Sequence, residues 1–361
     1  MKLLYIGDLE ETGTSAHRMQ ALERLGFTVR GLDTQPYASA GGWLGGRMRL
    51  LLLAGPTIDR LNRAVLAAAA DFDPAFVWFD KPLFVRPDTL DTLKAQGRAL
   101  VNYICDNPFS PLPHEHGWRL ARRTIPLFDL CIVPRAVSVA DFRAAGAARV
   151  ALMPFAFEPW CHYPPPPDTV RQDTAVSFIG SPYGDRPAFM ARLAALGHPV
   201  TVRGSRWQTH HRIDGPSLWL GPPVLGGAYR EAIWRARINL GMVTHGHRDP
   251  WGHRAFEITA AAGFLLGERT EGHVACFTEG KEAEFFDSVE EASDKAAFYL
   301  AHDSARAAIA AAGCRRAWMD GYGNDDRLAA AIGVLDPSLG GRLMDTARTI
   351  IARRRDALGI V

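Results

Sequence analysis

Apolar and polar residues alternate along the first half of the chain in a way that predicts strands and helices in turn. An apolar run at residues 2–8 is typical of a buried strand, and apolar positions at 16–27 recur with the spacing of an amphipathic helix. Another apolar run follows at 27–33, and the same order repeats to about residue 155. Because such alternation forms parallel sheets covered by helices, this half predicts a Rossmann-like α/β domain.

Four consecutive prolines at 164–167 interrupt the pattern, which restarts with an apolar run at 175–180. Consecutive prolines cannot continue a helix or lie in a central strand, so they predict a stiff linker. At 361 residues the chain also exceeds the roughly 250–300 at which single cores stop growing. We therefore expect a first Rossmann-like domain at 1–163, a linker at 164–174, a second Rossmann-like domain at 175–336, and a C-terminal helix at 337–361 that could cross back to the first domain.

One long stretch of the first domain is rich in glycine. Residues 36–46 are glycine-rich and predict a flexible loop. A helical stretch should follow from about 47 to 70, with a break near Gly55 and Pro56.

Composition excludes several classes of protein. A formal charge of +2, with 22% charged residues, gives no net electrostatic case for nucleic acid. Five cysteines form no CxxC pair, which favours reduced thiols over disulfides or zinc. The apolar run at 2–8 is too short for a signal peptide, and no run reaches the roughly 20 residues of a membrane span. These features predict a cytoplasmic protein whose membrane contact, if any, is peripheral.

The last predicted helix, about 343–358, is rich in arginine. Such a helix could lie on anionic lipid, but a solvated basic face is the more common explanation.

Two acidic residues, Asp249 and Glu257, lie eight positions apart around a predicted helix start near 252–254. Both carboxylates and several backbone N–H groups could then face one crevice. Helix N-termini hold anions, and carboxylates accept hydrogen bonds from sugar hydroxyls. The alternative is an ordinary loop with two solvated acids.

In the first half, Gly13 begins a loop at the end of the first strand, where doubly wound sheets bind ligands. The loop lacks GxGxxG, so it does not favour a dehydrogenase. His17 could contact phosphate or a second substrate, or be a surface histidine. Asp106 ends a strand and could be a base, a sugar-binding acid or a capping residue. The pair His114 and His116 lacks a third ligand spaced beside it, so we expect no metal site.

The second half resembles GT-B glycosyltransferases of the group 1 type, especially the spore-maturation (CgeB-like) branch. The resemblance covers about 175–330, and the first half matches only in architecture. It is carried by several short stretches in order: 178–181, Arg186, 202–204, Tyr229, 238–240, 254–257, 262–266, 279–282, 299–300 and 315–327.

This resemblance implies a GT-B fold, with parallel sheets facing a central cleft, and a nucleotide-sugar donor held mainly by the second domain. A diphosphate needs cations and converging N–H donors, which Arg186 and the loop of Gly180 and Ser181 could supply. A solvated surface arginine is the alternative for Arg186. Arg203 could face the nucleotide, and Arg254 could bind the diphosphate or pair with Asp249.

The resemblance also implies that Glu257 binds the ribose hydroxyls and that Asp249 contacts the transferred sugar. Here the chain departs from the family pattern, because Asp is one methylene shorter than the usual Glu. Backbone donors near the phosphates are expected from Gly252, Thr270 and Gly272, although a simple turn would also explain the last two.

The expected activity is transfer of a sugar from a nucleoside diphosphate to an unidentified acceptor, with retention of configuration. The second half has no Asp-x-Asp triplet, so neither a metal nor another cofactor is expected. Asp106, His17 and Asp249 are the candidate catalytic residues. A nucleotide-sugar epimerase and a non-catalytic nucleotide- or sugar-binding protein are the alternatives, and the sequence does not reveal base, sugar or acceptor.

Overall fold

The computed structural model describes residues 1–40, 42–110, 115–207 and 217–360. The chain divides into two compact units. The first comprises Met1–Pro154 and Asn324–Ile350, and the second comprises Phe155–Gly323 and Ile351–Val361. These bounds differ from the expected domains at two places, since residues 155–163 belong to the second unit and residues 324–336 to the first.

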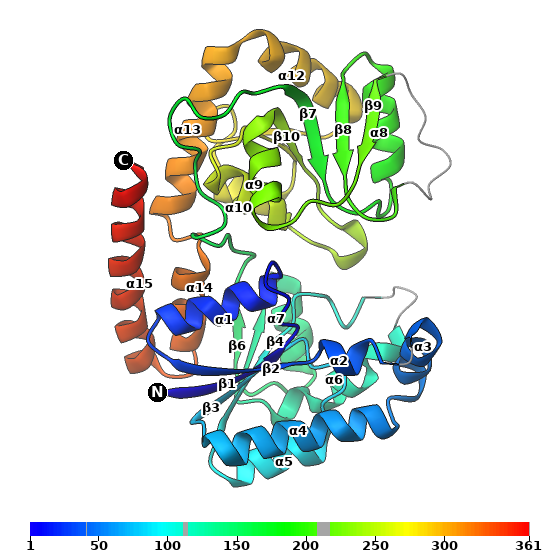
Figure 1. Ribbon diagram of the computed structural model, residues 1–361, viewed down its shortest axis with the longest axis vertical. Helices are drawn as coiled ribbons and strands as arrows, with labels where there is room; N and C mark the ends of the chain where they lie inside the picture. The colour runs from blue at the N-terminus through cyan, green and yellow to red at the C-terminus, as the bar shows by residue number, and fades with distance from the viewer. Residues whose placement is uncertain (41, 111–114, 208–216, 361) are drawn as a thin grey trace. The chain divides into compact units, whose positions relative to one another are not determined.

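The first unit contains a parallel six-stranded sheet in the order β2-β1-β3-β4-β5-β6 (Figure 1). The strands are β1 (Lys2–Gly7), β2 (Thr28–Asp33), β3 (Phe76–Asp80), β4 (Ala99–Tyr103), β5 (Leu130–Val133) and β6 (Val150–Leu152). The helices are α1 (Thr14–Arg24), α2 (Gln35–Ala38), α3 (Gly42–Leu52), α4 (Pro56–Phe72), α5 (Pro87–Ala95), α6 (Arg119–Thr124), α7 (Ala136–Ala144), α14 (Asn324–Gly333) and the first part of α15 (Pro337–Leu358).

Alternate side chains of β1 enter different cores. Leu3 and Tyr5 pack with α1, α14 and α15, whereas Leu4 and Ile6 pack with α4, α5 and α7. Successive side chains of a strand point to opposite faces, so a run that is apolar at every position must be covered on both. Helices cover both faces of this sheet, so the apolar side chains on either side of its strands are buried.

The second unit repeats the plan with the strand order β12-β11-β10-β7-β8-β9, again all parallel. Its strands are β7 (Thr174–Ile179), β8 (Val200–Arg203), β9 (Leu218–Gly221), β10 (Ala236–Gly241), β11 (Leu265–Glu268) and β12 (Glu284–Phe286). Its helices are α8 (Arg186–Ala195), α9 (Gly226–Arg235), α10 (His253–Ala260), α11 (Glu271–Cys276), α12 (Val289–Ala301) and α13 (Asp303–Met319).

One face of the second sheet is apolar, and the other carries polar residues. Val176 and Phe178 of β7 pack with α8 and α12 in the main core. On the opposite face, Ser177 and Thr201 line a cavity of about 240 Å³ beneath α9.

The structure contradicts the predicted loop at 36–46, where it has α2 and the start of α3. Pro36 lies in the first turn of α2, where its missing N–H removes no helical hydrogen bond. In α3, Leu50 lies against Gly117, so tertiary packing supports a helix that its glycines disfavour. The predicted break at Gly55 and Pro56 is confirmed, because α3 ends before it and α4 begins there.

The C-terminal helix α15 begins in the first unit, and its last turns belong to the second. Within the second unit, Arg354 lies over the rings of Trp160 (5.4 Å) and Tyr163 (4.9 Å), so this guanidinium packs on protein. Among the described residues no helix is both long and apolar enough to cross a membrane.

Candidate functional site

The strongest cluster of functional side chains lies in the second unit, where β7 and β10 end. These strands are neighbours, and the loops that follow them lead toward α8 and α10. Parallel strands place their carboxyl ends at one edge of the sheet, which is where doubly wound folds bind ligands.

Arg186 is the first residue of α8 and only 8% exposed. Its Nη1 donates to the carbonyl oxygen of Ser181 (3.1 Å), and its Nη2 donates to that of Val243 (3.0 Å). A longer bond joins Nη2 to Thr244 Oγ1 (3.3 Å). Arg186 is thus a buried cation, not a solvated surface residue, and it ties the loop after β7 to the loop after β10.

The charge of Arg186 has little compensation. Within the part of the chain that the structure describes, its guanidinium bonds only to neutral oxygen atoms. Burial lowers the pKa of Arg186, and the neighbouring charge of Arg254 lowers this pKa further. The positive charges of Arg186 and Arg254 repel each other in a partly desolvated site, and a bound anion would stabilise both.

Arg254, in the first turn of α10, is fixed on two sides. Its Nε donates to the carbonyl oxygen of Ile179 at the end of β7 (2.8 Å), and its Nη1 donates to Glu257 Oε2 (2.8 Å). The side chain remains 37% exposed. Arg254 therefore pairs with Glu257 rather than with Asp249, the protein partner considered from the sequence.

Glu257 lies in α10, and its side chain is only 4% exposed. Tyr229 Oη donates to its Oε2 at 2.6 Å. Burial alone would raise the pKa of Glu257, but the charges of His253, Arg254 and His162 hold that pKa well below its usual range. Glu257 is thus a buried anion whose partners are protein groups.

The helix start predicted near 252–254 is confirmed, with Gly252 as the N-cap of α10. The Gly252 N–H donates to His273 Nε2 (2.8 Å), while His273 Nδ1 lies 2.6 Å from the carbonyl oxygen of Glu268. The ring therefore carries its hydrogen on Nδ1 and accepts at Nε2. Sequence reasoning missed His273, and this bond occupies a backbone donor expected to face the ligand.

Thr270 and Gly272 pack against Pro250 in the loop before α10. Thr270 caps α11, and its Oγ1 donates to the carbonyl oxygen of Pro250 (2.5 Å). A side chain at Gly272 would collide with the same carbonyl group. These contacts tie both residues into the packing under the loop, at the start of α11, and a role for their backbone N–H groups near the phosphates stays a prediction.

Four other residues were expected to bind the donor, and they lie in three different places in the second unit. Asp249 is half-buried in the loop before α10. Gly180 and Ser181 follow β7, and the Gly180 carbonyl oxygen accepts from Trp207 Nε1 (2.6 Å). Arg203 ends β8, lies over the Trp219 ring (4.7 Å) and lines the cavity beneath α9.

The first unit has its own polar cluster at the carboxyl ends of its strands. Gly13 is the N-cap of α1, and His17 in that helix is 7% exposed, which contradicts its interpretation as a surface residue. Asp106, after β4, pairs with Lys81 (Oδ2 to Nζ, 2.5 Å).

Sequence reasoning missed the ion pair of Arg18 and Asp80 in this unit. Arg18 Nε lies 2.7 Å from Asp80 Oδ2 and Nη2 lies 3.1 Å from Oδ1, and Tyr5 Oη donates to Oδ2 (2.6 Å). The sequence did offer one signal for this site, because Asp80 is an acidic residue at the end of an apolar run. Nothing in the sequence identified Arg18 as its partner.

The pair considered as metal ligands is not tested. His114 lies outside the described residues, and the side chain of His116 is not described. Among the described residues, no three His, Cys, Asp or Glu side chains are placed to hold a metal ion.

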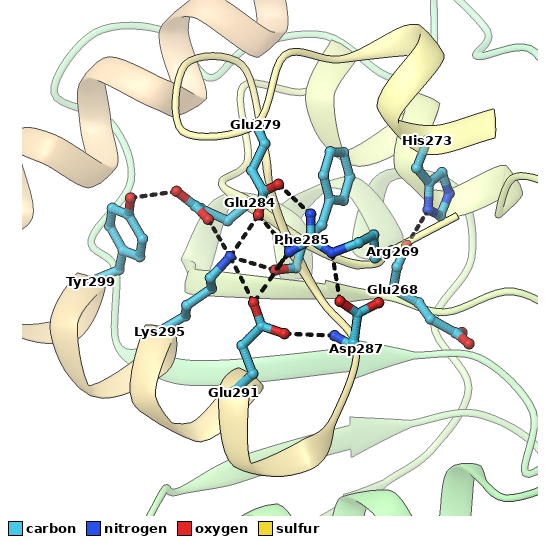
Figure 2. Close-up of polar contacts among 10 residues, drawn as sticks. All are labelled: Glu268, Arg269, His273, Glu279, Glu284, Phe285, Asp287, Glu291, Lys295 and Tyr299. Atoms are coloured by element: carbon cyan, nitrogen blue, oxygen red, sulfur yellow. Dashed lines mark hydrogen bonds and ion pairs between the residues drawn. The ribbon is translucent and has the colours of Figure 1, made fainter. Parts of the chain in front are cut away.

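Beyond β11, a charged network fixes the edge of the sheet next to the site (Figure 2). Arg269 pairs with Glu279, Asp287 and Glu291. Lys295 of α12 pairs with Glu279 (2.7 Å) and with Glu284 of β12 (2.8 Å). These ion pairs join β12 and α12 to the loops that follow β11, precede β12 and follow β12.

Comparison with known proteins agrees with this architecture. Residues 186–333 match the model of the Glycosyl transferase-like family. No curated protein matches the chain in sequence.

Solved structures match nearly the whole chain at low identity. Sucrose-phosphate synthase from Thermosynechococcus elongatus is 12% identical, with a TM-score of 0.66 over 98% of this chain and 100% of that one. Anabaena HepE in complex with UDP-glucose is 12% identical, with a TM-score of 0.61 over 97% and 100%. A putative UDP-N-acetylglucosamine 2-epimerase from Listeria monocytogenes is 12% identical, with a TM-score of 0.54 over 93% and 97%. The two parallel-sheet, Rossmann-like units thus form a GT-B fold, as predicted.

The network around Arg269 should make the second unit sensitive to acid. Hydrogen bonds from Arg269 lower the pKa of Glu279 to about 2, whereas the pKa of a glutamate in an unfolded chain is about 4.3. A lowered pKa contributes stability above the unfolded value, and this contribution is lost as pH falls from about 5 to 2. We expect Glu279→Gln to flatten the decrease in unfolding temperature over this range.

Glu290→Gln serves as the control, because Glu290 of α12 forms an exposed pair with Arg192 of α8 (3.3 Å). The unfolding temperatures of the native chain and both variants are measured by circular dichroism between pH 5 and 2. Parallel pH profiles for the native chain and Glu279→Gln would contradict the prediction.

Proposed function

We propose that the chain is a glycosyltransferase that moves a sugar from a nucleoside diphosphate to an acceptor, within the group 1 type and its spore-maturation branch. The observation that carries this proposal is the pair of guanidinium groups where β7 and β10 end. Arg186 is buried there on neutral oxygen atoms, and Arg254 keeps a partly exposed edge beside it. The family match over 186–333 supports it.

In the proposed mechanism the two arginines bind the donor diphosphate and stabilise the negative charge that grows on it as the sugar leaves. Guanidinium groups suit phosphate because they remain charged and present several N–H donors in one plane. Arg186 and Arg254 are held by backbone carbonyl groups before any ligand binds, so little reorganisation is needed.

The transferred sugar is assigned to Asp249, the half-buried acid of the loop before α10. A role for Glu257 in binding ribose stays a prediction. On the acceptor side, Asp106 and His17 of the first unit are the candidates to bind or orient the acceptor. Arg203 lines a separate cavity, and its role toward the nucleotide also stays a prediction.

Donor binding is the first expectation to test. We expect one of UDP, GDP, ADP or dTDP to raise the unfolding temperature, since a ligand at 100 times its Kd stabilises by about 2.7 kcal/mol. Arg186→Gln should weaken binding about tenfold or more, because hydrogen bonds to charged groups contribute about 1.5–3 kcal/mol. Calorimetry measures both affinities.

Arg192→Gln is the matched control, since Arg192 lies on the same helix but its side chain is 56% exposed and pairs with Glu290. It should keep the native affinity. No shift with any of the four nucleotides would contradict donor binding.

Metal independence is a second expectation. We propose that Arg186 and Arg254 supply the charge that a divalent cation provides in metal-dependent transferases. Turnover should therefore survive EDTA unchanged. Complete loss with the chelator, restored by magnesium or manganese, would overturn this part of the proposal and direct attention to Asp106.

Retention of the anomeric configuration is the third expectation. An inverting enzyme needs a positioned base on the acceptor side. Asp106 is instead held in an ion pair with Lys81. The departing phosphate, held by the two arginines, would accept the acceptor's proton on the same face of the sugar. NMR of the product from an α-linked donor should show an α linkage, whereas a β linkage would make Asp106 or His17 the catalytic base.

A further inference from the structure

The Glu257 carboxylate is enclosed by side chains from three parts of the second unit. Tyr229 of α9 donates to Oε2 (2.6 Å), and Arg254 of α10 donates to the same oxygen (2.8 Å). His162, from the segment before β7, places Nε2 3.8 Å from Oε1. With 4% of the side chain exposed, a ribose hydroxyl could reach this carboxylate only if the enclosing groups moved.

The protonation of His162 follows from its other ring nitrogen. The backbone N–H of Glu158 donates to His162 Nδ1 (3.0 Å), so the neutral ring carries its hydrogen on Nε2. That nitrogen faces Glu257 Oε1. The ring also meets the edge of Tyr229, with centroids 5.7 Å apart, and its side chain is 5% exposed. His162 is therefore locked in an orientation that favours the charged carboxylate.

The carboxylate in turn fixes Arg254. The guanidinium is held at Nε by Ile179 and at Nη1 by Glu257, and the Tyr229 ring lies 4.8 Å from it. Its Nη2 makes no hydrogen bond to any of the described residues, and more than a third of the side chain is exposed. A guanidinium held on one edge and open on another loses little freedom when it binds an anion.

We propose that His162 and Tyr229 are positioning residues of the donor site, which act through the Glu257 carboxylate to hold the Arg254 guanidinium toward the donor diphosphate. This inference rests on the proposed function and deepens it. It separates two roles of Glu257. If the carboxylate binds ribose, its partners affect the nucleoside and the diphosphate alike. If it positions Arg254, they affect only ligands that carry a diphosphate.

The test is a double-mutant cycle with two ligands, UDP and uridine. Tyr229→Phe and His162→Gln are each made in the native chain and in the Arg254→Gln variant. In the native background, we expect each to weaken UDP binding about three- to tenfold, less than the loss of a direct hydrogen bond to a charged group, because both residues act through Glu257. In the Arg254→Gln background neither should have a further effect, and uridine affinity, measured by NMR titration, should not change.

Two substitutions of the same chemistry serve as controls. Tyr299 Oη donates to Glu284 Oε1 (2.7 Å), and His198 Nε2 lies 2.9 Å from Ser293 Oγ, both within the second unit but in other contacts. Tyr299→Phe and His198→Gln should keep the native affinity for UDP. They show what the loss of a buried tyrosine or histidine bond does to the fold alone.

The outcomes separate the two proposals. Equal losses of UDP and uridine affinity would make Glu257 a ribose ligand and overturn the inference. Losses that persist in the Arg254→Gln background would overturn it as well, because they would not pass through Arg254. If Tyr229→Phe and His162→Gln bind UDP as the native chain does, the inference fails and the proposed function stands. If the native chain binds no nucleoside diphosphate, both fail.

Discussion

The balance of charge around the Glu257 carboxylate is the constraint on which the second unit's site depends. This buried anion pairs with Arg254, and the charge of Arg254 in turn acts on the neighbouring guanidinium of Arg186. Removing one partner of a buried ion pair leaves an uncompensated charge, so this arrangement resists change within the protein. The second cation, Arg186, donates its hydrogen bonds to neutral oxygen atoms of the described residues, and among these residues the charges of Glu268 and Asp185 act on it without forming a hydrogen bond or ion pair. A bound anion would complete this balance, which is the physical argument for the proposed phosphate ligand.

The parallel topology brings these groups together. Because β7 and β10 are neighbours and end at one edge, the loops that follow them meet, and Arg186 bonds to both. His273 and Thr270, after β11, hold the loop before α10 from the other side. The loop that carries Asp249 is therefore supported by residues from three strand ends, which suits a site that must hold its shape before a ligand arrives.

Hydrophobic periodicity predicted most of the elements, because long buried strands and amphipathic helices leave strong signals. It missed the short edge strands β9 and β12, and the helical residues 35–38 and 42–46, where tertiary contacts outweigh glycine and proline. The acid spacing located the start of α10. It could not show that Glu257 is buried, or that His162 and Tyr229 enclose it, because these contacts arise only when distant segments pack.

Sugar transfer is most directly tested by measuring the release of nucleoside diphosphate from a nucleotide sugar with and without acceptor. The donor is the one whose nucleotide binds, and the acceptors are mixtures of small sugars, glycans, lipids and proteins. The account predicts release that depends on an acceptor and yields a glycosylated product. An isomerised nucleotide sugar formed without acceptor would contradict it in favour of an epimerase. Tight donor binding with no turnover in any mixture would contradict it in favour of a binding protein.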